Sequence, residues 1–251
     1  MITSMQNKRV KQWKKLHTKK GRQLSKTFLI EGYHLVEEAH KSCAHILEII
    51  VPAKGGVSSP YDQYPVYRVS DQIFQHLSQT ERPQDMIAVV KKMPTQKIIG
   101  NHLLLVDAVQ DPGNLGTIIR TADAAGFSGV ILGEGTVDVF NDKVIRATQG
   151  SIFHLPIVNE INLLDYIRKL KHEGYEIWAS ALQQSVDYTH IEPSPKTALI
   201  LGNEGAGIRE EVLNLADVIV KIPIYGKAES LNVSVAAGIL MYRIVTPKGH
   251  E

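Results

Sequence analysis

Residues that can bind or orient a polar ligand gather in three short loops of the sequence. The loops span residues 107–116, 202–207 and 223–232. Their carboxylate, amide and hydroxyl groups exchange hydrogen bonds, and an arginine just beyond the first loop can stabilise negative charge. These side chains are Asp111, Asn114, Arg120, Glu204, Ser230 and Asn232. Glycines in the second loop, GNEGAG, let the backbone approach a ligand closely.

Each of the three loops follows a predicted strand. The strands are expected at 102–106, 197–201 and 218–222, and all are short apolar runs typical of a buried parallel sheet. Ligands of open α/β sheets bind beyond the carboxyl ends of the strands. We therefore expect the three loops to converge on one site.

The third loop enters a helix that is apolar on almost its whole circumference, from about Leu231 to Val245. Ser230 or Asn232 can cap this helix, which gathers free N–H groups and a positive dipole end at one place. The apolar pattern predicts burial on most sides. A plain core helix explains the apolar positions, but it does not explain Glu229, Ser230 and Asn232 together at the helix start.

Taken singly, these signals are weak. The spacing of the glycines in 202–207 differs from that of a dinucleotide-binding fingerprint, and no acidic ribose ligand follows. Arg120 also has a plain alternative interpretation, as a surface arginine paired with Asp111 or Asp123.

The first 26 residues are strongly basic and contain no acidic residue. They hold nine of the 28 basic residues of the chain, so the remainder carries a net charge of −7. A basic segment on an acidic body predicts a polyanionic partner such as RNA, although a solvated helix face is the alternative. Trp13 and His17 could stack on bases. The predicted RNA-binding residues are Lys8, Arg9, Lys11, Lys14, Lys15, Lys19, Lys20 and Arg22.

Composition and periodicity predict an α/β protein of two units. Residues 1–91 alternate short helices and strands, with a helix over 5–16 and a loop over 17–25. The polar, proline-containing stretch 92–100 is the predicted linker. Residues 101–251 alternate strands and helices throughout, which predicts a parallel sheet with helices on both faces, including a strand over 154–158.

Other features narrow the class of protein. Cys43 is the single cysteine, so intrachain disulfides and cysteine-based metal clusters are excluded, and no other metal-ligand spacing is present. No apolar run is long enough to span a bilayer, and the basic N-terminus lacks the apolar segment of a secretory signal. We expect a cytoplasmic protein with neither a membrane nor a metal partner.

The three loops together resemble the motifs of the SpoU (TrmH) family of RNA ribose 2′-O-methyltransferases. Residues 111–122 (DPGNLGTIIRTA) are similar to the first motif, 201–207 (LGNEGAG) to the second, and 222–224 (IPI) with 229–234 (ESLNVS) to the third. Residues 146–151 (RATQGS) with Pro156 match a further stretch, where the family often has a small residue in place of Gln149. Residues 8–90 resemble the family's small RNA-binding domain, which is related to a ribosomal-protein fold.

This resemblance implies several properties that spacing alone does not. The family fold contains a deep trefoil knot of the SPOUT type and works as a homodimer. The cofactor is S-adenosylmethionine, its adenosine part held by backbone groups at Gly202, Ile222 and Leu231, with the strand end near Ala181 as a further candidate.

The resemblance also implies roles for the polar residues. Arg120 from the partner protomer would lie near the ribose 2′-hydroxyl. Asn114 would position Arg120 or the phosphate. Glu204, Ser230 and Asn232 would shape the pocket and hold the ribose and the cofactor.

The predicted substrate is large-subunit 23S-type rRNA, because the N-terminal unit suits a structured target. A tRNA 2′-O-methyltransferase is the alternative within the class. A catalytically silent RNA-binding or ribosome-assembly protein and a nucleotide-binding enzyme unrelated to RNA are alternatives outside it.

Overall fold

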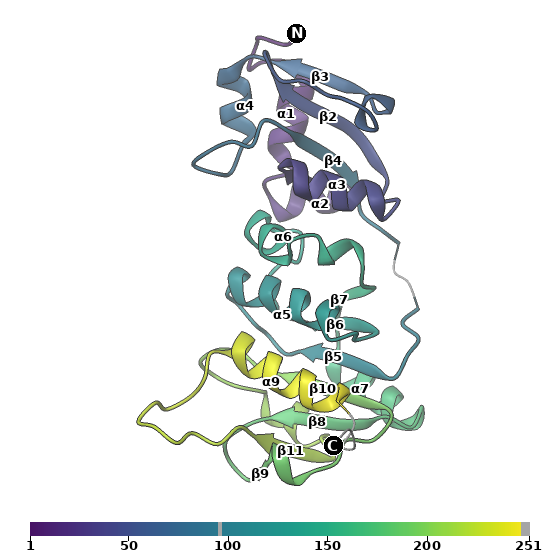
Figure 1. The fold of residues 1–251 in the computed structure, drawn as a ribbon, viewed down its shortest axis with the longest axis vertical. Helices are drawn as coiled ribbons and strands as arrows, with labels where there is room; N and C mark the ends of the chain where they lie inside the picture. The colour runs from purple at the N-terminus through teal and green to yellow at the C-terminus, as the bar shows by residue number, and fades with distance from the viewer. Residues whose placement is uncertain (95–96, 247–251) are drawn as a thin grey trace. The chain divides into compact units, whose positions relative to one another are not determined.

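A computed structural model describes residues 1–94 and 97–246 (Figure 1). The chain divides into two compact units. The first comprises Met1–Pro94 together with Phe140–Phe153, and the second comprises Thr95–Val139 and His154–Glu251. The segment 140–153 therefore packs with the N-terminal unit although its sequence neighbours belong to the other. The domain boundaries at 91 and 101 stay predictions.

The elements of the first unit form a small sheet with helices. Its helices are α1 (Lys8–Lys15), α2 (Lys19–Ser25), α3 (Tyr33–Lys41), α4 (Asp71–Leu77) and α6 (Asp142–Thr148), with 3₁₀ turns η1 (Tyr61–Gln63) and η2 (Ser151–Phe153). Its strands are β1 (Thr27–Glu31), β2 (Ile46–Pro52), β3 (Val66–Val69) and β4 (Ile87–Lys91). The sheet order is β1-β4-β2-β3, with β4 antiparallel to both of its neighbours and β2 parallel to β3.

The prediction of a loop over 17–25 is wrong, because most of this segment forms helix α2. Thr18 caps α2 by accepting a hydrogen bond from the Gly21 N–H at 3.1 Å. A Cβ at Gly21 would lie 2.0 Å from the Lys15 carbonyl oxygen, so only glycine permits this close turn between α1 and α2. A lysine-rich, polar heptad carries little periodic signal.

Aromatic packing joins the segment 140–153 to the first unit. The ring of Phe28, 1% exposed, lies 4.8 Å from Phe140 and 6.4 Å from Phe153, measured between centroids. Gly150 sits directly against Glu38 of α3, where a Cβ would come within 2.6 Å of the glutamate side chain. This segment therefore completes the core of the N-terminal unit.

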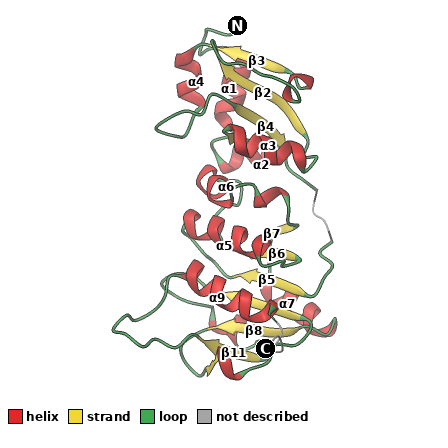
Figure 2. Ribbon diagram, in the orientation of Figure 1, coloured by secondary structure: helices red, strands yellow, loops and turns green. Residues whose placement is uncertain are grey.

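The second unit is a parallel sheet covered by helices (Figure 2). Its strands are β5 (His102–Val106), β6 (Gly129–Gly133), β7 (Ile157–Ile161), β8 (Glu176–Ser180), β9 (Val186–Asp187), β10 (Thr197–Leu201) and β11 (Val218–Lys221). Its helices are α5 (Pro112–Ala124), α7 (Leu163–His172), α8 (Glu210–Leu213) and α9 (Val233–Val245), with the 3₁₀ turn η3 (Tyr188–His190). The strand order is β7-β6-β5-β10-β8-β11-β9, and every pairing is parallel.

This arrangement confirms the predicted α/β class and the parallel sheet. The strand predicted over 154–158 begins later, at Ile157, and the two-residue strand β9 at the sheet edge was not predicted. The deep trefoil knot stays a prediction of the resemblance. No helix within 1–94 or 97–246 has both the length and the apolar character needed to cross a membrane.

Side chains that alternate along the central strands build two layers of core. Leu103 and Leu105 of β5 join a cluster with Ile167 of α7 and Val212 of α8. The alternate side chains, such as Leu104, are equally buried and point to the other face. Helices α5 and α9 pack side by side there (Figure 1).

The prediction that α9 is buried on most sides is wrong within the single chain. Ala237, Leu240 and Met241 are fully buried, but Val235 is 52% exposed and Tyr242 is 51% exposed. Helix α9 therefore packs one side against its own chain and leaves an apolar side uncovered.

Candidate functional site

The second and third loops line one cavity, together with the residues that follow β8, whereas the first loop contributes no residue to its lining and is joined to the other two by hydrogen bonds. The cavity measures about 640 Å³ and is lined mainly by residues of 180–183, 201–208, 221–224 and 230–236. Among the predicted site residues, the lining includes Gly202, Glu204, Ile222, Ser230, Leu231 and Asn232. Ala181, the further candidate, also lines it. The convergence follows from parallel strands whose carboxyl ends meet at one edge.

Glu204 joins the second loop to the first. Its carboxylate accepts hydrogen bonds from the Gln110 N–H at 3.1 Å, the Asp111 N–H at 3.0 Å and the Asn114 amide at 3.0 Å. Partial burial raises the pKa of Glu204, but these donors outweigh it and hold the pKa below its usual value. Glu204 is therefore an ionised group that fixes the loops.

Asn114 joins the first loop to the third. The Asn232 amide donates to Asn114 Oδ1 at 3.0 Å, while Asn232 Oδ1 caps α9 by accepting from the Ser234 N–H at 2.9 Å. Asp111 caps α5 by accepting from the Asn114 N–H at 2.7 Å. One chain of hydrogen bonds thus links the starts of both helices to Glu204.

An ion pair that the sequence did not indicate, between a buried aspartate and a partly exposed arginine, joins the first loop to the segment just after the second loop. The Asp107 side chain is fully buried and lies 2.8 Å from both Nε and Nη2 of Arg209. It also accepts the Arg209 backbone N–H at 2.9 Å. Hydrogen bonding to Asp107 raises the pKa of Arg209. The only available signal was an acidic residue directly after the apolar strand 102–106.

The glycine loop itself is closed tightly. Asn203 and Gly207 exchange backbone hydrogen bonds at 2.9 and 3.0 Å, and the Asn203 amide donates to the Ala108 carbonyl at 2.8 Å. A Cβ at Gly202 would lie 2.3 Å from the Gly207 carbonyl carbon and 2.4 Å from the Ile208 nitrogen. Gly202 is therefore required for the loop to form.

Arg120 lies outside the cavity, on the exposed side of α5. Its alternative interpretation as a paired surface residue is wrong. Asp123 contacts His154 at 2.8 Å, and Asp111 caps α5. Arg120 makes no hydrogen bond or ion pair with the residues of 1–94 and 97–246, so its guanidinium is available to another molecule.

Comparison with known proteins decides the family. The SpoU rRNA methylase family model matches residues 101–242, and a model of the MRM3-like substrate binding domain matches 7–88. The chain belongs to the SpoU rRNA methylase family. This confirms the resemblance read from the three loops.

Related proteins match this SpoU chain over nearly its full length. The 23S rRNA (guanosine(2553)-2′-O)-methyltransferase RlmP of Bacillus subtilis is 50% identical over 97% of this chain and 98% of its own. The AdoMet-bound rRNA methyltransferase from Sinorhizobium meliloti has a TM-score of 0.85 at 33% identity, covering 97% and 96%. AviRb from Streptomyces viridochromogenes, in complex with AdoMet, has a TM-score of 0.87 at 26% identity, covering 96% and 97%.

The basic segment of this SpoU protein is only partly accessible. Arg22 is 5% exposed and donates to the Leu16 carbonyl at 2.8 Å, so the structure contradicts its predicted contact with RNA. Lys14 is half-buried and donates to the His76 carbonyl at 2.7 Å. Arg9 pairs with Glu48. Among the predicted RNA-binding residues, the exposed lysines are Lys8, Lys11, Lys15, Lys19 and Lys20.

The rings of Trp13 and His17, which were expected to stack on bases, are not exposed at the surface for such a contact. Trp13 is 2% exposed and its indole N–H donates to Glu48 at 3.2 Å. Burial lowers the pKa of His17 to about 4, and its Nε2 is buried without a hydrogen-bond partner. Trp13 belongs to the core of the N-terminal unit because the apolar side of α1 packs inward, whereas His17, just beyond α1, is half-buried.

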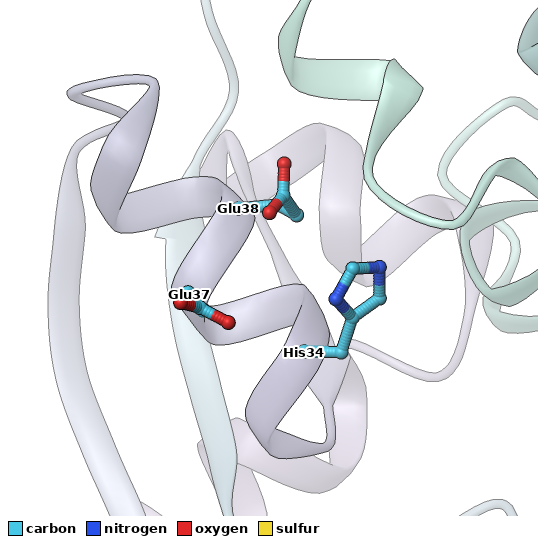
Figure 3. Close-up of side chains that lie close together, drawn as sticks. All are labelled: His34, Glu37 and Glu38. Atoms are coloured by element: carbon cyan, nitrogen blue, oxygen red, sulfur yellow. The ribbon is translucent and has the colours of Figure 1, made fainter.

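Three potential metal ligands lie together on α3, His34, Glu37 and Glu38 (Figure 3). His34 Nε2 lies 3.1 Å from the Gln149 carbonyl oxygen. Lys41 Nζ lies 2.8 Å from Glu37 and 3.6 Å from Glu38. Because each ligand group already has a partner, the geometry does not argue for a bound ion.

Proposed function

We propose that this protein transfers the methyl group of S-adenosylmethionine to a ribose 2′-hydroxyl of 23S-type rRNA in the cytoplasm. The observation that carries the proposal is the 50% identity to the Bacillus subtilis RlmP over almost both full chains. The same guanosine is the expected target, because the match includes the substrate-binding domain as well as the methylase domain.

The cavity fits S-adenosylmethionine in size and lining. A volume of about 640 Å³ lies in the range of small-molecule sites. Backbone groups at Gly202, Ile222 and Leu231 would hold the adenosine part, and Ser230 and Asn232 would orient the remainder. When bound, the cofactor supplies an electrophilic methyl group on a sulfonium.

The acceptor hydroxyl needs help because it is a poor nucleophile at neutral pH. The hydroxyl would lose its proton to water as it takes the methyl group. Arg120 would stabilise the negative charge developing on the ribose oxygen rather than remove this proton, since a guanidinium does not readily deprotonate. Asn114 would contribute by fixing the positions of Glu204 and Asn232, because it donates a hydrogen bond to Glu204 and accepts one from Asn232.

The position of Arg120 supports a homodimer. Arg120 lies outside the cavity of its own chain and would serve the cavity of a second copy. A Cβ at Gly238 of α9 would lie 3.7 Å from Thr121 of α5, next to Arg120, so the two helices cross closely there. The uncovered apolar residues Val235 and Tyr242 flank that crossing and offer a surface for the second copy.

Methyl-labelled S-adenosylmethionine tests the proposal with 23S rRNA and tRNA transcripts as separate substrates. Label in an alkali-resistant dinucleotide from rRNA is the expected result. Label in tRNA alone would support the tRNA 2′-O-methyltransferase. RNA binding without label on transcripts or on ribosomal particles would support the catalytically silent RNA-binding protein.

Arg120→Ala is the matched variant for the same assay. Loss of one donor that stabilises charge costs about 10²- to 10³-fold in kcat. We expect that loss with unchanged cofactor affinity, because Arg120 does not line the cavity. Full activity of the variant would remove Arg120 from the reaction.

A further inference from the structure

Tyr225 is the most exposed of the large apolar or aromatic side chains in the described part of the chain, at 94%. No aromatic ring within 1–94 or 97–246 stacks on it, and no cation lies over its face. An aromatic side chain presented in this way offers both faces of its ring to another molecule.

Tyr225 stands at the rim of the cofactor cavity. Ile224 before it and Ser230 after it line the cavity, so the intervening residues 225–229 bridge two wall positions and project outward. In Figure 1 the loop between β11 and α9 extends away from the sheet. Lys227, also exposed, carries a positive charge in the same short tip.

An aromatic ring and an ammonium group suit the two parts of a nucleotide. Unpaired RNA bases are recognised by stacking on aromatic side chains, and phosphates by lysine. The ribose that receives the methyl group must enter this cavity, so its own base or an adjacent base must pass the rim.

We propose that Tyr225 is a base-stacking contact for the RNA segment that carries the acceptor ribose, with Lys227 facing its phosphate. This rests on the proposed function, since it assumes that RNA is the molecule that approaches the cavity. It assigns substrate recognition to the methylase unit itself, in addition to the basic N-terminal unit.

Substitution of Tyr225 tests the contact by steady-state kinetics on a 23S rRNA transcript. Tyr225→Ala should raise the KM for RNA about tenfold. Tyr225→Phe keeps the ring and should stay within about twofold of the parent, whereas Tyr225→Leu keeps the apolar bulk and should behave like alanine. Affinity for S-adenosylmethionine should stay unchanged in all three, because Tyr225 does not line the cavity. Equal KM values for Tyr225→Ala and the parent would overturn the proposal.

A fluorescence experiment reads stacking without turnover. Tyr225→Trp introduces an exposed indole, whereas Trp13 and Trp178 are 2% and 0% exposed and shielded from acrylamide. The rRNA transcript should protect the introduced indole from acrylamide quenching. Unchanged quenching with RNA bound would contradict the inference even if the protein methylates rRNA. If the parent protein methylates no RNA, the proposed function fails, and this experiment still decides the contact.

The loop could instead be covered by a second copy of the chain. Light scattering on Tyr225→Ala distinguishes that case. A mass equal to that of the parent is the expected result. Loss of an oligomer that the parent forms would place Tyr225 in a contact between copies and would overturn its assignment to RNA.

Discussion

Replacing Arg209 with methionine tests how the cavity loops are held. Asp107 is fully buried and receives three donors from Arg209, and the substitution removes two of them together with the compensating charge. Breaking a fully buried ion pair costs about 3–5 kcal/mol. Because Arg209 is 42% exposed, water replaces part of the lost interaction, and we expect the free energy of unfolding to fall by about 2 kcal/mol.

Differential scanning calorimetry measures this loss. For a unit of this size, a loss of 1 kcal/mol in the free energy of unfolding lowers the melting temperature by roughly 2–4 °C. The second unit should therefore melt about 4–8 °C lower. Titration calorimetry should also show weaker binding of S-adenosylmethionine, since the loop 202–207 loses one of its attachments. Glu211→Gln is the matched control, because Glu211 contacts the same guanidinium at 3.3 Å but is 59% exposed, and surface pairs contribute little. Equal melting temperatures for the two variants would refute the reasoning.

Three further substitutions probe the two units. Gly202→Val should prevent the loop from closing, because its Cβ meets backbone at 2.3 Å; cofactor affinity equal to that of the parent, by titration calorimetry, would contradict this. Lys11→Ala should remove about one phosphate contact, so the slope of log binding constant against log salt concentration should become shallower by roughly 0.7–0.9 in filter-binding titrations. An unchanged slope would make Lys11 a solvated surface residue. His17, with a pKa near 4 against 6.5 unfolded, binds its proton preferentially in the unfolded state. The folded state therefore favours neutral His17. The free energy of unfolding is not reduced by this group above pH 6.5, and it decreases as the pH falls from 6.5 toward 4. Melting curves of His17→Gln should show a shallower pH dependence over that window than the parent protein.

The sequence was sufficient to predict the convergence of the three loops. Apolar runs of five residues indicate buried parallel strands, and the carboxyl ends of such strands share one edge. Asn232 also caps α9 as expected, because amide side chains favour that position and an apolar helix follows. Local chemistry and sheet topology agree at each of these places.

Sequence patterns failed where burial depends on which partner a segment meets. Arg22 and Trp13 have residue types suited to RNA, yet the fold buries both against the N-terminal sheet and its helices. Asp107 is buried although aspartate is usually exposed, because a residue 102 positions away supplies its charge partner. A helix at 142–148 gives the same periodic pattern whichever unit it packs against, so nothing local assigns 140–153 to the first unit.

The proposed homodimer would account for both the uncovered side of α9 and the position of Arg120. Exposed apolar residues on a helix are unfavourable in water, and half-exposed Val235 and Tyr242 lie on the same helix as the buried Leu240. Arg120, on the adjoining helix α5, has no partner within the described chain and no place in its own cavity. A second copy packed on this surface would bury the apolar side and bring Arg120 to a cavity whose lining, among residues 1–94 and 97–246, includes no arginine. The apolar pattern of α9, which overstates burial in one chain, is then the pattern expected of a helix shared between two.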